Sequence, residues 1–141
     1  MKGAAMLVDA EFSKAEDGIS MLHAVAQDQA FQDICALDDV IPGTGVAALL
    51  GGEQIALVRS PDGAFVFAIS NFDPFSKAFV LARGIVGDRG GVLKIASPIY
   101  KQNFDLKTGV CLDDPNVRLP VYPVKLDGGR IYVAARKSES K

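Results

Sequence analysis

The sequence contains almost no histidine or cysteine, and it has no tryptophan. Its 141 residues include one histidine, His23, and two cysteines, Cys35 and Cys111. An iron–sulfur cluster or a zinc site held by thiolates takes about four cysteines, so one copy of the chain cannot form either. Two cysteines far apart in a chain of this size are typical of free thiols in a reducing compartment, and a Cys35–Cys111 disulfide is the less favoured alternative.

The chain also lacks a charge excess and a long apolar run. Its formal net charge is −2, which gives no basic footprint for nucleic acid. The apolar runs are far shorter than the about 20 residues that cross a bilayer. The N-terminus shows no basic region followed by a long apolar one, as a signal peptide would. We therefore expect a cytoplasmic protein that binds neither nucleic acid nor membrane.

Short apolar runs, separated by turn signals, make up most of the chain. Hydrophobic residues amount to 49% of the sequence, enough for a sizeable core in one domain. The runs recur at the spacing of about 8–12 residues that is typical of an all-β sandwich or barrel, and no sustained helical period appears after Gln29. Strands are expected at residues 31–37, 46–50, 54–59, 64–70, 80–83, 85–86, 92–96, 104–106, 110–112, 121–126 and 130–135.

The two ends of the chain differ from this middle part. Residues 1–29 are interpreted as an N-terminal extension, with a weak helix expected at residues 15–27 and His23 as a solvated side chain. The extension either packs on a partner or is a frayed end, and the second interpretation is favoured. Residues 137–141 are a polar tail, so the β domain is expected at residues 30–136.

A glycine-rich stretch, Gly43-Thr44-Gly45-Val46-Ala47-Ala48, matches a dinucleotide-binding pattern by letter. That pattern needs a helix that opens directly after it, so that the helix N-terminus meets the pyrophosphate. Gly51-Gly52 follows too soon to leave room for a helix. The stretch is therefore interpreted as a turn that leads into a strand.

Two short loops carry the candidate site. The segments Asn71-Phe72-Asp73-Pro74 and Ser97-Pro98-Ile99-Tyr100 each follow an apolar run and each contain a proline. Between them lies Arg83-Gly84-Ile85-Val86-Gly87-Asp88, and after the second comes Phe104-Asp105-Leu106-Lys107-Thr108-Gly109. This arrangement resembles the Rieske iron–sulfur domain and, within it, the small subunit of the assimilatory NAD(P)H-dependent nitrite reductase. The resemblance covers residues 31–135.

The resemblance implies an antiparallel Rieske-like β domain with two apposed loops. In a Rieske domain, a Cys-x-His loop and a Cys-x-x-His loop hold one [2Fe–2S] cluster. Here Asn71 and Asp73 stand at the first pair of ligand positions, and Ser97 and Tyr100 stand at the second pair. The chain is therefore expected to hold no cluster, and no catalytic, cofactor-binding or metal-binding residue is expected on it.

The resemblance also implies a partner, the large subunit of nitrite reductase. That subunit would carry FAD, sirohaem and a [4Fe–4S] cluster and reduce nitrite to ammonium in nitrogen assimilation. The present chain would have a structural or regulatory role and no catalysis of its own. Two alternatives remain open: a Rieske-type ferredoxin that carries electrons, and a freestanding protein-interaction module.

Four large apolar side chains in the two loops are candidates for partner binding: Phe72, Phe75, Ile99 and Tyr100. Loops normally lie at the surface, so large apolar side chains at their tips need a reason. They either fold inward, into the space that a cluster would take, or form a contact patch for another protein. Both interpretations stay open from the sequence.

The polar side chains of the same loops are expected to hold the loops side by side. Asn71, Asp73, Ser97 and the Tyr100 hydroxyl offer donors and acceptors across the gap. Asp73 and Asp105 could instead pair as acid–base or metal-binding carboxylates. The favoured interpretation is that both accept hydrogen bonds from turn amides, which is the commoner role of aspartate in such loops.

Overall fold

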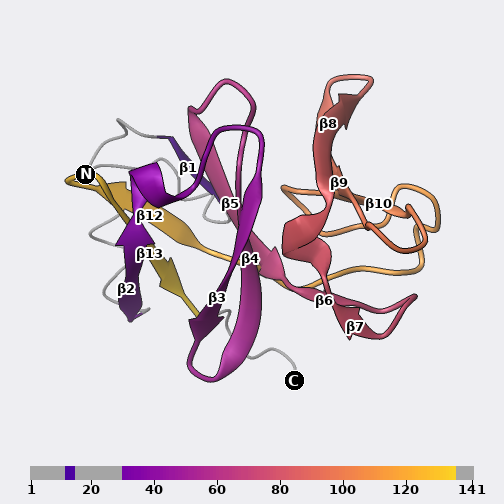
Figure 1. Cartoon of the computed structure of the whole chain (residues 1–141), viewed down its shortest axis with the longest axis horizontal. Helices are drawn as coiled ribbons and strands as arrows, with labels where there is room; N and C mark the ends of the chain where they lie inside the picture. The colour runs from indigo at the N-terminus through magenta and orange to yellow at the C-terminus, as the bar shows by residue number, and fades with distance from the viewer. Residues whose placement is uncertain (1–11, 15–29, 136–141) are drawn as a thin grey trace.

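A computed structural model describes residues 12–14 and 30–135, and it confirms the all-β prediction (Figure 1). The expected helix at residues 15–27 and the tail at residues 137–141 lie outside the described residues. Two lobes stand side by side in Figure 1, with the sheets of β1–β5 and β11–β13 in the first lobe and β6–β10 in the second. Within the described residues, no helix is long and apolar enough to cross a membrane.

The central sheet of the first lobe contains three consecutive antiparallel strands. Two short turns join β3 (Gly45–Leu50), β4 (Glu53–Arg59) and β5 (Phe65–Ser70). Gly51 and Gly52 take φ of +56° and +88° in the first turn, a region that glycine enters without a side-chain clash. The stretch that matches a dinucleotide pattern is therefore a turn followed by β3, as expected.

The N-terminal extension supplies one strand that the sequence did not predict. β1 (Phe12–Lys14) pairs antiparallel with β5, with Phe12 opposite Phe67 and Lys14 opposite Phe65. β11 (Val121–Tyr122) pairs with the next residues of the same β5 edge. Three residues are too few to show an alternating pattern, which is why the sequence gave no signal for β1.

A second sheet covers one face of this sheet. It contains β2 (Phe31–Ala36), β12 (Val124–Asp127) and β13 (Arg130–Ala134) in the order β12-β13-β2. Pro123 divides the strand that was expected at 121–126, because proline has no N–H for the ladder. As a result, β11 pairs with the central sheet and β12 with the covering one.

The second lobe is built from two small antiparallel units. Three strands form a sheet in the order β10-β9-β8, namely β8 (Ile85–Arg89), β9 (Val92–Ala96) and β10 (Asn103–Asp105). A short hairpin of β6 (Phe72–Asp73) and β7 (Ala78–Phe79) lies beside it.

The hairpin of β4 and β5 is buried on both faces and joins two hydrophobic cores. Ile55 and Leu57 belong to the core of the first lobe, whereas their neighbours Ala56 and Val58 belong to the core shared with the second lobe. β5 alternates in the same way. This explains why both strands read as nearly continuous apolar runs, since a strand with two buried faces has no polar side.

The strand expected at residues 80–83 is a wrong prediction. Leu81–Arg83 form a 3₁₀ turn, η2, with Leu81 and Ala82 buried. The Leu81 and Ala82 amides both donate to Asn71, at 3.1 Å to its carbonyl and 2.7 Å to its side chain. These bonds to one residue replace a strand ladder. The strand expected at residues 110–112 is also less regular than predicted. It pairs with β10 through a single antiparallel β-bridge, between Phe104 and Cys111.

Phe104→Ala is expected to lower the free energy of unfolding by about 3–5 kcal/mol. The Phe104 ring is fully buried and lies 6.1 Å from the Phe75 ring, centroid to centroid. Phe79→Ala in the same lobe serves as the control. Phe79 is 53% exposed, so its loss should cost no more than its ring contact with Phe72, about 1 kcal/mol. Denaturant titration measures both, and equal losses would contradict this account of the second core.

Candidate functional site

The two candidate loops lie side by side, as the sequence predicted, and a buried hydrogen bond joins them. The Ser97 hydroxyl, just after β9, donates to Asp73 Oδ2 at 2.6 Å. Both residues have no exposed surface. These are the first ligand position of the second loop and the second ligand position of the first loop. A serine–aspartate pair therefore connects the loops where a Rieske domain would have a cluster.

Asp73 accepts further hydrogen bonds within its own loop. Its Oδ2 accepts from the Ser76 hydroxyl at 2.8 Å, and its Oδ1 accepts from the Phe75 amide at 2.9 Å. Burial by itself would raise the pKa of Asp73, but the hydrogen bonds from Ser97, from the Phe75 amide and from Ser76 outweigh it and hold the pKa below its ordinary value. The pair is thus a carboxylate with its donors, ionised at neutral pH.

Asn71 and Tyr100 do not bridge the loops, contrary to the expectation from the sequence. Asn71 is buried, but its side chain donates to Gln54 Oε1 at 3.2 Å and accepts from the Ala82 amide. It therefore fastens the first loop to β4 and η2. Tyr100 is 62% exposed, so its ring lies at the surface and not between the loops. Sequence spacing alone could not show which way either side chain turns.

Both loops contain the same five-residue turn. Asp73 accepts the Phe75 amide at its side chain and the Lys77 amide at its carbonyl, the latter at 2.7 Å. Ser97 does the same with the next residues of its own loop, at 3.3 Å to its side chain and 3.1 Å to its carbonyl. The fifth residues, Lys77 and Lys101, have φ of +62° and +65°. Asp73 and Ser97, the second and third ligand positions of the Rieske pattern, thus begin two turns of one shape.

The hairpin after β10 repeats this turn a third time. The Asp105 side chain accepts the Lys107 amide at 2.8 Å, and its carbonyl accepts the Gly109 amide at 2.8 Å. Here the fifth residue is a glycine, with φ of +83°. Asp105 is therefore an acceptor for turn amides, which was the favoured interpretation, and its carboxylate does not pair with that of Asp73.

The four apolar loop residues do not share one environment. Phe75 is half-buried and packs against the second core. Phe72 is also half-buried and contacts the ring of Phe79 at 5.1 Å between centroids. Ile99 and Tyr100 are 45% and 62% exposed. Phe75 therefore folds inward, which was one of the two open interpretations. The other, a contact patch for another protein, remains open for Ile99 and Tyr100.

The donor set at the four ligand positions does not fit a [2Fe–2S] cluster. A Rieske iron takes thiolate sulfur and imidazole nitrogen, whereas these positions offer an amide, a carboxylate, a hydroxyl and a phenol. The hydroxyl of Ser97 donates its hydrogen bond to the carboxylate of Asp73. Cys111 is buried in the second core, and Cys35 packs against the first. No group of three or more potential metal ligands occurs in the described part of the chain.

Cys35 also lacks the character of a reactive thiol. Burial raises the pKa of its thiol, and the neighbouring Asp39 and Asp33 carboxylates raise it further against an opposing effect of Arg130. A raised pKa leaves little thiolate at neutral pH, and the thiolate is the form that binds metals and reacts. Both cysteines are free.

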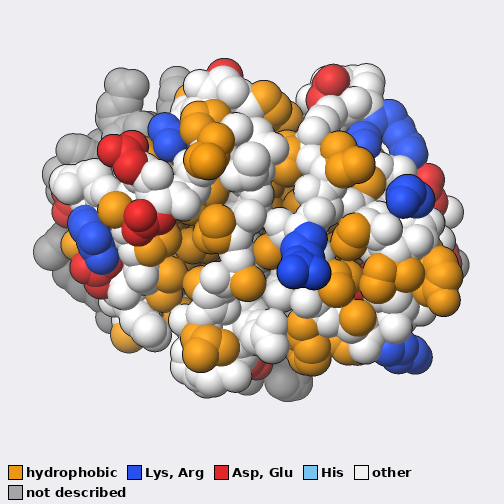
Figure 2. All heavy atoms as spheres, in the orientation of Figure 1, with side chains coloured by type: hydrophobic (Ala, Val, Ile, Leu, Met, Phe, Trp, Pro, Cys, Tyr) orange, Lys and Arg blue, Asp and Glu red, His pale blue; other side chains and the backbone are white. Residues whose placement is uncertain are grey.

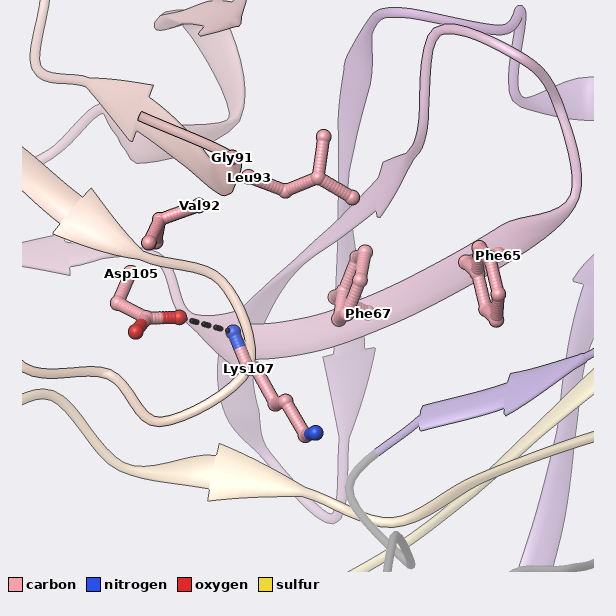
Figure 3. Close-up of a pocket in the computed structure, with 7 residues that line it drawn as sticks. All are labelled: Phe65, Phe67, Gly91, Val92, Leu93, Asp105 and Lys107. Carbon is pink, nitrogen blue, oxygen red and sulfur yellow. Dashed lines mark hydrogen bonds between the residues drawn. The ribbon is translucent and has the colours of Figure 1, made fainter. Parts of the chain in front are cut away.

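A groove of about 270 Å³ lies between β5 of the first lobe and the β8–β10 sheet of the second (Figure 3). Phe65 and Phe67 of β5 form one wall, and Leu93 of β9 faces them. Asp105 and Lys107 lie at one end, where the Asp105 carboxylate accepts the Lys107 amide, as the dashed line in Figure 3 shows. The lining of the groove is thus mostly apolar, with Asp105 and Lys107 as its two charged residues, and no feature of the sequence predicted it.

Comparison with known proteins agrees with this geometry. Residues 30–134 match the model of the Rieske-like [2Fe-2S] domain family. The nitrite reductase (NADH) small subunit of Salmonella typhimurium is 46% identical over 103 residues, which cover 73% of this chain and 95% of that protein. A crystal structure from Mycobacterium tuberculosis, described as an NADH-dependent nitrite reductase small subunit, is 53% identical with a TM-score of 0.73, covering 78% of this chain and 98% of that one.

A third relative is a much longer protein. The nitrite reductase [NAD(P)H] large subunit of Klebsiella oxytoca is 41% identical to this chain over 103 residues. Those residues cover 73% of this chain but only 11% of the Klebsiella protein. In that organism a domain similar to this chain is therefore part of the large-subunit polypeptide itself.

Ser97→Ala is expected to lower the free energy of unfolding by about 1–3 kcal/mol, because it leaves a buried carboxylate without one of its donors. Ser76→Ala removes another hydroxyl from the same Asp73 oxygen, but Ser76 is only half-buried and lies within the first loop. It should therefore cost less. Chemical denaturation of the two variants compares the loss of the bond between the loops with the loss of a bond inside one loop. If Ser76→Ala proves the more damaging change, the bond between the loops is not the main support.

Proposed function

The chain belongs to the family of Rieske-like [2Fe-2S] domains, and we propose that it is the cluster-free small subunit of an NAD(P)H-dependent nitrite reductase. In this proposal the enzyme reduces nitrite to ammonium for nitrogen assimilation in the cytoplasm. FAD, sirohaem and a [4Fe–4S] cluster reside on the large subunit. This chain supplies no catalytic residue, and its role is structural or regulatory.

The observation that carries the proposal is the pair of Asp73 and Ser97 at former ligand positions. The 2.6 Å bond between them keeps the loops together through protein atoms alone. A lobe that is held in this way keeps the shape of a Rieske lobe without its redox centre. Without a redox centre, such a lobe can contribute through the surface it presents to another protein, which supports a function in binding.

The large subunit is the partner that the relatives support. A similar domain is joined to a large subunit in one polypeptide of Klebsiella oxytoca. A covalent link keeps two domains at high effective concentration, which favours even a weak contact between them. The present chain, when separate, would need an interface that provides this affinity by itself.

We place the docking surface on the two loops, at Phe72, Phe75, Ile99 and Tyr100. Ile99 and Tyr100 are exposed and form its outer part. Phe72 belongs to the other loop and contacts Phe79, and Phe75 supports the same loop from the core side. Buried tyrosines are common among the residues that dominate interface affinity. The docking unit is the β domain at residues 30–136, with residues 1–29 as an extension to it.

The two alternatives have less support. A Rieske-type ferredoxin needs the cluster to carry electrons, and the donor set on this chain does not fit one. A freestanding interaction module would explain the exposed loop tips equally well. It would leave the similarity to small subunits over nearly their whole length without a reason.

Affinity purification of the tagged full-length chain from its own organism is expected to recover a large subunit with the absorption spectrum of sirohaem. The chain purified alone and anaerobically should contain no stoichiometric iron and should not reduce nitrite with NADH. Recovery without any sirohaem protein would contradict the small-subunit proposal. Iron and sulfide bands in the isolated chain would instead support the ferredoxin alternative.

Tyr100→Ala is expected to weaken association with the large subunit by about 2 kcal/mol, ~30-fold, if Tyr100 becomes fully desolvated in the interface. Ile99→Ala should act in the same direction, and neither change should alter the thermal stability of the free chain. Ile41→Ala is the matched control, because Ile41 is 66% exposed but lies in the first lobe. Phe75→Ala should mainly lower stability. Unchanged association of the Tyr100 and Ile99 variants would place the interface elsewhere.

A further inference from the structure

Charge is distributed unevenly between the two lobes. Residues 71–112, which contain both loops, include six lysines or arginines and three aspartates, so their net charge is +3. Because the whole chain has a net charge of −2, the remaining residues carry −5. The stretch that contains both loops is therefore cationic, whereas the rest of the chain is acidic.

The three aspartates of this stretch do not neutralise its surface at the loops. Asp73 is fully buried. Asp105 accepts the amides of its own turn, and Asp88 accepts the Gly91 amide at the β8–β9 turn, at 3.1 Å. The carboxylates of residues 71–112 thus lie inside the lobe or at turns away from the two loops. Asp113, just after this stretch, accepts from the Asn103 amide at 2.8 Å and forms its ion pair with Arg89, at 3.3 Å.

Three exposed cations border the loops. Lys77 and Lys101 are the fifth residues of the two turns that the Asp73–Ser97 bond joins. Arg83 lies at the end of η2, which is held against the end of β9, since a Cβ on Gly84 would overlap the Ala96 carbonyl. These three residues surround the same pair of loops from three segments of the chain.

Exposed hydrophobic side chains lie among these cations. Ile99 and Tyr100 are joined by Phe79 and Ile85, which are 53% and 67% exposed. Ile85 lies opposite Ala96, next to the second loop, and Phe79 lies opposite Phe72 in the first. Figure 2 shows hydrophobic side chains gathered over the β6–β7 hairpin and the adjoining part of the second lobe, with lysine and arginine at the margins. We call these residues the tip surface: Lys77, Phe79, Arg83, Ile85, Ile99, Tyr100 and Lys101.

Lys77 and Lys101 both have an unfavourable backbone conformation. Their positive φ is a left-handed conformation in which the Cβ of a non-glycine residue is crowded. The third turn of the same shape has Gly109 at the equivalent position. Glycine would therefore be the easier residue in all three turns. Strained residues of this kind tend to occur at functional sites, and here what the strain retains is a positively charged side chain on each loop.

The charge also indicates what the tip surface meets. A second copy of this chain would bring two cationic tips together, and like charges across an interface are repulsive. An apolar centre with a charged rim is typical of protein interfaces. A rim of lysine and arginine is complementary to a surface rich in aspartate and glutamate.

We propose that the tip surface is an electrostatic docking surface that recognises an acidic face of the large subunit, with Lys77 and Lys101 as its specificity-determining charges. This inference rests on the proposed function, since it names the chemistry of the surface that the large subunit offers. The apolar residues of the tip are buried at the contact, and the cations set the orientation and the rate of association.

The test is a binding titration between the full-length chain and the purified large subunit at several salt concentrations. Lys101→Glu and Lys77→Glu should each weaken binding about tenfold or more at low salt, mainly through the association rate, and should flatten its salt dependence. Lys125→Glu makes the same change of net charge in the first lobe, where Lys125 lies over the Tyr132 ring. This control should leave binding unchanged. Equal effects at all three positions would reduce the role of the tip to net charge and overturn the inference.

Lys101→Gly separates binding from structure. It removes the charge and also relieves the left-handed strain, so the melting temperature of the free chain should stay equal or rise while binding weakens. Undiminished binding of Lys77→Gly and Lys101→Gly would overturn the inference, and the small-subunit proposal would still stand if the wild-type chain binds. Failure of the wild-type chain to bind the large subunit at any salt concentration would overturn both.

Discussion

A buried carboxylate is the support on which the arrangement of the two loops depends. Removing the charge of Asp73 from water is costly, and the cost is offset only because Ser97, Ser76 and the Phe75 amide all donate to it. One of these donors comes from the other loop, so the charge is satisfied only when the loops are together. In a cluster-bearing domain, metal–ligand bonds would order the same segments. Here the hydrogen bonds of one anion order them, so the residues at the ligand positions directly maintain the shape of the lobe.

The hairpin of β4 and β5 connects that site to the rest of the molecule. Its residues alternate between two cores, so each lobe packs on one face of the same two strands. Asn71 then ties the first loop to this hairpin through Gln54 and to η2 through the Ala82 amide. Side chains on the tip surface are therefore mounted on a base that is packed from both sides. A surface with such support loses little conformational freedom on binding, and a pre-organised surface of this kind favours affinity.

The sequence predicted those features that depend on local pattern. The apolar runs located β3, β4, β5, β9 and β13, and the resemblance to the Rieske loops implied that Asp73 and Ser97 would lie close together. It could not predict which way a side chain turns out of a loop, so Asn71 and Tyr100 were expected between the loops and lie elsewhere. The strand expected at residues 80–83 failed because two amides of that segment bond to Asn71, ten or more residues earlier in the chain. Tertiary contacts of this kind leave no trace in hydrophobic periodicity.

The pairing of β2 with β13 brings together the two ends of the family-related region. Phe31, at the start of the family-related region, lies opposite Ala134, at its end. A region whose two ends lie side by side can be joined to a longer polypeptide, or excised from it, with little disturbance of its interior. Such a region can therefore exist as a separate subunit or as one segment of a larger protein, and a sequence similar to it lies within the Klebsiella oxytoca polypeptide. Because its two ends are paired strands, the region can be encoded either by a gene of its own or as part of a longer gene.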